Sequence, residues 1–546
     1  MSESRLKALF RAVAVALGAA ETIAARNSIS PDGRSYLEIA KAYLRHDWTA
    51  SVNAYWSPLY SWLSALALGL VRPAWRWEYP TIHAMNFLIF LAALAAFEYF
   101  WNGLQCSELG VPNRILWVLG YSLFLWLTLA NLPLVNPDLC VAIMVYLIAG
   151  LMLRIRNSAG ARYFVQLGIA LAFGYFAKAM LFPMAFVFLM VLLMARVPWK
   201  GVALAAAIFF AIAAPQIFLL SRAKRHLTFS ESGLLTLVWS NYDVPTRNWQ
   251  GQPAGNGTPT HPTRQIYQHP AVFEFNGPIH ASYPPWYDPS YWNDGLRFHF
   301  VPGVVLRHSL HNTGQILSYF LQPKVWALAM LIFAVLSAPS TFTGIARHWF
   351  LLVPAIAAFA MYSLTFAEFR YMSAWEMMLW AAFLFGLQLR KEPSKQILPW
   401  LAGLTAAVML VSCANSIRVQ LVSGRRDDAA PEYRIVEELR ELGVHSGEKV
   451  AAIGFDNDAH WAYLSQLSII AEIDADQTCE FWSSSPAIQE EILKKFKQSG
   501  ASLVVARVSE GIRSTSYANP PDLASCARPT PVWKTLPNGN LVYLLQ

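Results

Sequence analysis

Long apolar runs separated by short polar segments dominate the first 417 residues of the chain. Many of these runs approach the 20 residues that an α-helix needs to cross the hydrocarbon core of a membrane. We predict about eleven spanning helices from this pattern. The two runs beside Lys178 are short for full spans, which indicates tilted or broken helices. The predicted spans cover residues 8–25, 80–101, 114–133, 138–154, 163–177, 180–195, 201–221, 324–339, 347–366, 371–389 and 397–416.

The spanning pattern is interrupted in three places. Residues 26–79 form a first loop, residues 222–323 form a polar loop rich in Pro, His, Tyr and Trp, and residues 418–546 form a polar tail. Within the first loop, SYLEIAKAYL (35–44) has helical spacing and SPLYSWLSALALGLVRP (57–73) is apolar. Because neither stretch is long enough to span a bilayer, we expect both to be helices that lie in the membrane interface.

The tail alternates between helix and strand patterns, which predicts a small α/β domain of Rossmann-like, three-layer arrangement. It contains no G-x-G-x-x-G phosphate loop, so no nucleotide is assigned to it. Its two cysteines, Cys479 and Cys526, either pair in an oxidising compartment or lie apart. Helices are expected at 431–444 and 486–500, and strands at 449–455, 464–473, 501–508 and 538–545.

Composition supports an integral membrane protein, because 55% of the residues are hydrophobic and only 14% are charged. The mean hydropathy is +0.34. Lys and Arg mark every loop on the side of the N-terminus, so the positive-inside rule places the N-terminus in the cytoplasm. Both large loops and the tail then lie outside, although the first loop also carries several basic residues. The net charge of +8 needs no nucleic acid to explain it.

Ionisable residues gather at the outer ends of the predicted helices. Asp32 follows the first span, Asp138 separates the third and fourth, Lys178 joins the two short helices, and Glu368 and Arg370 separate the ninth and tenth. Charges at membrane depth are costly and usually face a cavity or one another. Two carboxylates that converge with a Lys and an Arg would suit a base beside a phosphate clamp.

Each of these residues also has a purely structural interpretation. Asp32 and Asp138 would each serve as an N-cap for the helix that follows. Lys178 would extend its ammonium toward the membrane surface, and Glu368 and Arg370 would form an ordinary ion pair. Spacing alone leaves these alternatives open.

Four short motifs favour the functional interpretation, because their order resembles that of the C-clan membrane glycosyltransferases. This clan includes the protein O-mannosyltransferases and the lipid A aminoarabinose transferases, and the resemblance covers roughly residues 8 to 390. The first motif lies in the first loop, and the others follow along the chain. They are D-x-x-x-Y-x-x-I-A with P-L-x-x-W (Asp32, Tyr36, Ile39, Ala40, Pro58, Leu59, Trp62), N-P-D-L (Asp138), G-x-x-x-K-A-x-x-x-P (Gly174 to Pro183) and E-x-R-Y (Glu368, Arg370, Tyr371).

The resemblance implies transfer of a sugar from a polyprenyl-phosphate carrier to a lipid, glycan or protein acceptor outside the membrane. Asp32 is expected to be the base on the acceptor hydroxyl, and Asp138 a second acidic residue of the site. Lys178 and Arg370 would contact the phosphate. We also expect Tyr36, His83, Glu368 and Tyr371 to contact substrate, although His83 also fits a structural, capping role.

The sequence departs from the clan in its first loop. Some relatives carry a Lys before their P-P-L segment, whereas this chain has Tyr55, Trp56 and Ser57 before Pro58. The segment YPPWYDPSYWNDG (283–295) matches no substrate motif. Its aromatic side chains would either stack on sugar rings or pack a loop that lacks regular structure. Of the two, we favour packing.

Two further points concern metals. The tail contains D-N-D (Asp456, Asp458) and D-A-D (Asp474, Asp476), a pattern that suggests a metal and a nucleotide sugar. We discount it, because nucleotide sugars are scarce outside the membrane. No cofactor is assigned with certainty, and the Asp32 and Asp138 pair leaves a divalent cation open.

Two other function classes compete with a glycosyltransferase of the bacterial inner membrane. A transporter or flippase of lipid-linked substrates would show repeats and charges at mid-membrane. The chain has no convincing internal repeat, and its charges gather at one face. A non-catalytic protein of envelope assembly would use the tail as a binding module and would tolerate the loss of Asp32.

Overall fold

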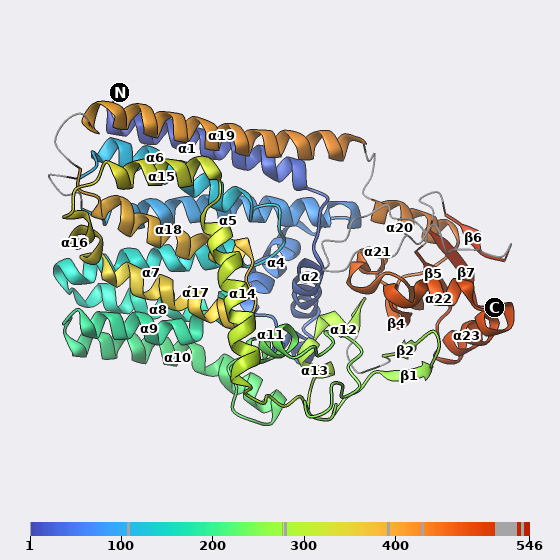
Figure 1. Ribbon diagram of the computed structural model, residues 1–546. Helices are drawn as coiled ribbons and strands as arrows, with labels where there is room; N and C mark the ends of the chain where they lie inside the picture. The colour runs from blue at the N-terminus through green and yellow to red at the C-terminus, as the bar shows by residue number, and fades with distance from the viewer. Residues whose placement is uncertain are drawn as a thin grey trace.

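The computed structural model of the chain has a bundle of long helices beside a smaller α/β domain, as Figure 1 shows. The N-terminus lies at the end of the bundle that is remote from the α/β domain. The predicted arrangement of a helical membrane protein with a small C-terminal α/β domain is therefore confirmed. The structure describes residues 2–105, 110–275, 277, 281–389, 394–426, 431–507, 532–536 and 540–545.

A helix occupies each predicted span. Five of the described helices are long and apolar enough to cross a membrane alone, or six if one bent pair is a single span. The number of spans thus stays a prediction, because several helices have 17 residues or fewer. The bundle helices are α1 (Glu3–Ala25), α5 (Glu78–Trp101), α6 (Asn113–Leu129), α7 (Asp138–Ser158), α8 (Ala161–Ala177), α9 (Leu181–Met194), α10 (Trp199–Lys224), α15 (Lys324–Val335), α16 (Thr341–Ala346), α17 (Trp349–Leu364), α18 (Phe369–Gly386) and α19 (Ser394–Arg426).

The first loop contains the two predicted helices, α2 (Pro31–Leu44) and α4 (Pro58–Val71). Each begins with a proline at its first helical position, where the missing N–H costs nothing. The short helices α3 (Trp48–Ser51) and η1 (Trp75–Trp77) complete the loop. The Ser61 hydroxyl donates to the Tyr36 carbonyl (3.0 Å) and ties α4 to α2.

The second loop contains more helix and strand than the polar loop that the sequence predicts. Its amphipathic helix α14 (Pro302–Phe320) meets α15 at an angle of 83°, so the predicted span 324–339 is one arm of a bent pair. Its short helices lie between the bundle and the α/β domain (Figure 1); they are α11 (Ser232–Asn241), α12 (Pro284–Tyr287) and α13 (Pro289–Trp292). Its strands β1 (Arg264–Tyr267) and β2 (Val272–Glu274) belong to the sheet of the α/β domain.

The C-terminal domain has a mixed sheet in the order β1-β2-β4-β3-β5-β7-β6. Strands β3, β4 and β5 are parallel, and side chains of α20 and α21 pack on one face while those of α22 and α23 pack on the other. This is the predicted three-layer arrangement. Its elements are α20 (Pro431–Glu441), β3 (Lys449–Ile453), η2 (Asp456–Asp458), α21 (His460–Ser465), β4 (Ser468–Ile473), η3 (Ala475–Gln477), α22 (Thr478–Ser483), α23 (Pro486–Gln498), β5 (Leu503–Ala506), β6 (Lys534–Thr535) and β7 (Leu541–Leu544).

The tail does not build this sheet alone. Strand β2 of the second loop pairs with β4 in antiparallel register, with Phe273 opposite Glu472. The loop thereby covers a sheet edge that would otherwise expose unpaired backbone groups. Cys479 is disulfide-bonded, whereas Cys526, the other cysteine of the tail, lies outside the described residues.

Buried polar contacts attach the α/β domain to the first loop. The guanidinium of Arg34, which is fully buried on α2, donates to the Asn457 carbonyl (2.9 Å). The Tyr463 hydroxyl donates to Glu78 (2.8 Å), and Glu78 also pairs with Lys41 (2.9 Å). The C-terminal domain therefore fixes the position of α2, the helix that carries Asp32.

Candidate active site

Asp32 lies in the first turn of α2, where the partial positive charge of the helix N-terminus favours a carboxylate. Ser30, and not Asp32, is the N-cap, because its hydroxyl accepts from the Gly33 amide (3.1 Å). The Asp32 carboxylate is thus left for other partners. A Cβ at Gly33 would lie 2.7 Å from the Val135 Cβ, so only glycine lets α2 approach the segment that leads to Asp138 so closely.

Asp138 is the first residue of α7, and its carboxylate is not the N-cap either, since Pro137 holds that position. The Lys178 ammonium donates to Asp138 at 2.8 Å. Lys178 follows α8 in an extended backbone conformation, which turns it out of the helix. The predicted convergence of these two residues is present in the structure.

Arg370 joins the two carboxylates in one cluster. Its Nη2 lies 3.1 Å from Asp32 Oδ2, and its Nε lies 3.8 Å from Asp138 Oδ2. The same guanidinium pairs with Glu368, the N-cap residue of α18. All five ionisable residues singled out in the sequence therefore meet, from four separate parts of the chain.

The cluster differs in exposure between its two aspartates. The Asp32 side chain is 21% exposed, whereas that of Asp138 is 3% exposed. An incoming hydroxyl can therefore reach Asp32 more readily than Asp138. The group contains three carboxylates for two cations. Arg370 contacts all three carboxylates, whereas Lys178 pairs with Asp138.

Two tyrosines border the cluster. The Lys178 ammonium lies 3.4 Å from the centre of the Tyr371 ring, and the Tyr371 hydroxyl accepts from Arg370 (3.1 Å). Tyr36 lies one turn along α2 from Asp32 and packs against Trp56 with ring centres 5.1 Å apart. Burial, with the negative charges of Asp32 and Asp138, raises the pKa of Tyr36, which keeps its hydroxyl protonated.

His83 has a different place. It is buried on α5, and its Nε2 lies 2.8 Å from the Ser28 carbonyl. That contact attaches α5 to the chain just before α2. No ion pair to the carboxylates is recorded for His83 within the described residues, and its structural interpretation fits this contact.

Trp286 is a neighbour of Asp32 that the sequence interpretation did not place in the site. Its indole Nε1 donates to Asp32 Oδ1 (3.3 Å), and it comes from α12 in the second loop. The available signal was the aromatic-rich segment 283–295. The sequence favours a packing role for that segment, and nothing in the sequence shows that it reaches the first loop.

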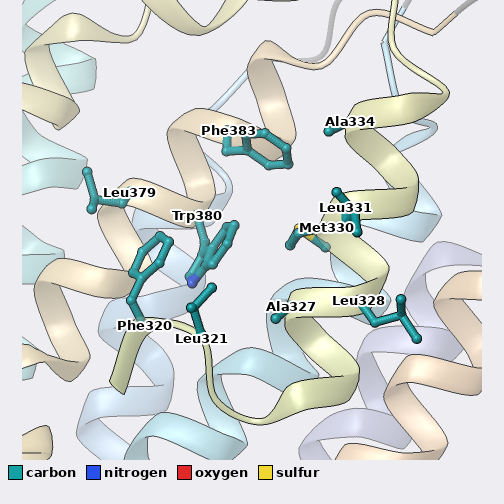
Figure 2. A pocket seen from close by; sticks show the side chains of 10 residues that line it. All are labelled: Phe320, Leu321, Ala327, Leu328, Met330, Leu331, Ala334, Leu379, Trp380 and Phe383. Atoms are coloured by element: carbon teal, nitrogen blue, oxygen red, sulfur yellow. The ribbon is translucent and has the colours of Figure 1, made fainter. Parts of the chain in front are cut away.

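An apolar cavity of about 570 Å³ lies between the bent pair α14–α15 and α18. Figure 2 shows Trp380 between Phe320 and the side chains of α15, and the rings of Phe320 and Trp380 are stacked with their centres 4.3 Å apart. Helix α18 begins with Phe369 and Arg370 of the charged cluster. The same helix thus carries a cation at its start and an apolar wall farther along. The lining residues are Phe320, Leu321, Ala327, Leu328, Met330, Leu331, Ala334, Leu379, Trp380 and Phe383.

A second acidic group lies in the C-terminal domain, where oxygens of Asp456, Glu472 and Asp474 lie within 4.8 Å of one another. Within the described part of the chain, it is the group whose geometry could hold a metal ion. Asp32 and Asp138 do not form such a group there. Arg247 pairs with Asp456 (3.0 Å), so a cation from the protein already neutralises part of the charge.

Comparison with known proteins identifies the fold. The sequence matches no protein-family model and, among curated proteins, none is significantly similar. The structure is similar to ArnT from Cupriavidus metallidurans bound to undecaprenyl phosphate, with a TM-score of 0.54 and 13% identity, over 100% of this chain and 99% of that one. The oligosaccharyltransferase AglB from Archaeoglobus fulgidus, in complex with an inhibitory peptide and a dolichol-phosphate, has a TM-score of 0.44 and 13% identity, over 92% of this chain and 70% of that one.

The similarity to ArnT extends over both the bundle and the C-terminal domain. The fold is therefore similar to that of ArnT, an aminoarabinose transferase and so a member of the clan that the sequence motifs resemble. The apolar helices and this fold together make the chain an integral membrane protein.

Proposed function

We propose that the protein transfers a sugar from a polyprenyl-phosphate-linked donor to an acceptor hydroxyl on the extracytoplasmic face of the membrane. The observation that carries the proposal is the single cluster of Asp32, Asp138, Lys178 and Arg370. It combines an accessible carboxylate with two cations, which are the groups needed to remove a proton and to stabilise a leaving phosphate.

The residues have distinct roles in this reaction. Asp32 takes the proton of the acceptor hydroxyl, whose oxygen forms a bond to the anomeric carbon as the bond from that carbon to the phosphate oxygen breaks. Lys178 and Arg370 hold the departing polyprenyl phosphate. Asp138 keeps both cations in place, because it contacts each of them.

Two further observations support a lipid-linked donor. The apolar cavity beside α18 offers room for a hydrocarbon chain on the helix that begins with Phe369 and Arg370. The fold is similar to that of ArnT, whose structure holds undecaprenyl phosphate. In the proposed arrangement the charged cluster faces the outer side of a bacterial inner membrane and the N-terminus faces the cytoplasm, as the positive-inside rule predicts.

The test is mass spectrometry of the lipids that co-purify with the wild type and with Asp32→Asn. A polyprenyl-phosphate sugar that accumulates on the variant, against bare polyprenyl phosphate on the wild type, would support the proposal and identify the sugar. Asp47→Asn is the matched control, since Asp47 caps a helix in the same loop and Asn preserves a cap. Bulk phospholipid alone on every variant would contradict the proposal and favour a transporter or an assembly protein.

A further inference from the structure

Three aromatic side chains from two loops meet beside Asp32. The ring centres of Trp239 and Trp286 lie 6.2 Å apart with an angle of 24° between their planes. Tyr55 of the first loop lies 5.6 Å from Trp239 and 6.1 Å from Trp286. We call Tyr55, Trp239 and Trp286 the aromatic cluster. All three are partly exposed, in contrast to Trp56, which is 8% exposed and packs against Tyr55 and Trp286.

The position of Trp286 is fixed by hydrogen bonds. Its carbonyl accepts from the Ser35 hydroxyl (2.8 Å) and from Trp56 Nε1 (3.1 Å). Its own indole N–H is directed to Asp32. A tryptophan that served only as an anchor in the membrane interface would instead direct its N–H toward the lipid headgroups and water. The ring is therefore held at a set distance from the proposed base.

The two oxygens of Asp32 have partners of different kinds. Oδ2 pairs with Arg370, which leads to Asp138 and Lys178, whereas Oδ1 accepts from Trp286. In the proposed reaction the phosphate of the donor lies on the side of the cations. The acceptor hydroxyl must then approach Asp32 from another side, and the aromatic cluster borders that approach.

On these grounds we propose that the aromatic cluster is an acceptor subsite that binds a pyranose ring, so that the acceptor is a carbohydrate. Rigid, partly exposed aromatic faces present negative charge to the polarised C–H groups of a sugar ring. A sugar stacked on Trp286 would place one of its hydroxyls near Asp32. This inference rests on the proposed glycosyl transfer and names the class of its acceptor.

The test uses saturation-transfer difference NMR on the full chain in a detergent without sugar, such as lauryldimethylamine oxide. The probes are methyl glycosides of glucose, galactose, mannose and N-acetylglucosamine, with sorbitol as a polyol that lacks a ring. We expect saturation of the ring protons of at least one glycoside but not of sorbitol. Trp286→Leu and Trp239→Leu should each weaken glycoside binding roughly three- to tenfold, whereas Trp286→Phe should retain most of it.

The matched control is Trp48→Leu, because Trp48 is an exposed tryptophan (62%) of the first loop with no recorded contact to Asp32. If Trp286→Leu fails to fold, Trp239→Leu and Tyr55→Leu provide the same test. Equal saturation of sorbitol, or glycoside binding that no aromatic-cluster variant changes, would overturn the proposal and leave packing as the role of these rings.

Adding undecaprenyl-phosphate glucose separates the acceptor from the donor. Persistence of the glycoside signal supports an acceptor subsite, whereas its loss would assign the cluster to the sugar of the donor and overturn the proposal. The two proposals also fail separately. Glycoside binding without a co-purified polyprenyl lipid would contradict the glycosyl transfer alone, and a bound polyprenyl lipid without glycoside binding would contradict the acceptor subsite alone.

Discussion

Arg370 and Asp32 are 338 residues apart in the sequence, yet the guanidinium Nη2 and the carboxylate Oδ2 lie 3.1 Å apart. This ion pair joins the start of α18 to the start of α2. It also makes Asp32 part of the same charge network as Asp138 and Lys178. A phosphate that enters the network must therefore compete with carboxylates for its cations.

Because a bound phosphate competes with carboxylates for Arg370, we expect Glu368→Gln to strengthen phosphate binding. Glu368 pairs directly with Arg370, so its neutral replacement leaves Arg370 with fewer acidic partners and removes a like charge from the path of a phosphate. We expect undecaprenyl phosphate to bind at least about threefold more tightly, with a larger gain at low salt. Native mass spectrometry or thermophoresis of the purified chain measures this, with Glu231→Gln of the second loop as the control. Weaker binding to Glu368→Gln would show that Glu368 supports the phosphate site.

The ion pair between buried Asp138 and partly exposed Lys178 predicts strong thermodynamic coupling. Lys178→Met would leave a carboxylate that is 3% exposed without its nearest cation, at a cost of about 3 kcal/mol in unfolding free energy. Adding Asp138→Asn should recover part of that cost, with a coupling energy above about 1 kcal/mol. Chemical unfolding of the wild type, both single variants and the double variant in detergent gives this coupling energy as a double-mutant cycle. The more exposed pair of Glu3 and Lys7 is the control, and its coupling should stay below about 1 kcal/mol. Additive effects at Asp138 and Lys178 would contradict the prediction.

The sequence predicted most of the helices and the gathering of the charges for one physical reason. A membrane confines each helix end to one of two faces, so residues at outer helix ends share a face whatever their separation in the chain. The contact of Asp32 with Trp286 joins residues 254 apart in the sequence, and the membrane faces do not determine it. It could therefore not be predicted in the same way. The same holds for the pairing of Phe273 with Glu472, since a three-residue strand carries too little pattern to reveal its partner.

A substitution at Gly33 tests how strongly turnover depends on the position of α2. A Cβ at this position would lie 2.7 Å from the Val135 Cβ and 2.9 Å from the Val135 carbonyl oxygen, so Gly33→Ala must move α2 away from the segment that leads to Asp138. A shift of this size should reduce turnover about 10- to 100-fold while the chain still folds. Transfer kinetics and a thermal melt measure the two effects. Gly233→Ala is the control, because none of the residues that the structure describes lies within 4 Å of its added Cβ. Wild-type turnover by Gly33→Ala would show that the spacing of α2 from this segment is not critical.

The acidic group of the C-terminal domain predicts a pH dependence of stability. Burial and the nearby charge of Asp474 raise the pKa of Glu472 well above its ordinary value. The folded state then holds the proton more tightly than the unfolded state, whose pKa is about 4.3. The stability that this proton provides is complete below about pH 4.3 and is lost as the pH rises through the folded-state pKa.

Glu472→Gln should therefore stabilise strands β3 and β4 at pH 8 and flatten the pH dependence between pH 5 and 8. The amide oxygen of Gln can still accept from the Tyr283 hydroxyl and from Asn248, which bond Glu472 in the wild type. Hydrogen exchange of residues 449–473 in the full chain measures this, after correction for the intrinsic exchange rate and with EDTA to remove cations. Glu490→Gln on the exposed side of α23 should leave the profile unchanged. A wild-type domain that becomes more protected as the pH rises would show that Glu472 is ionised in the folded state, held by Arg247 rather than by a proton.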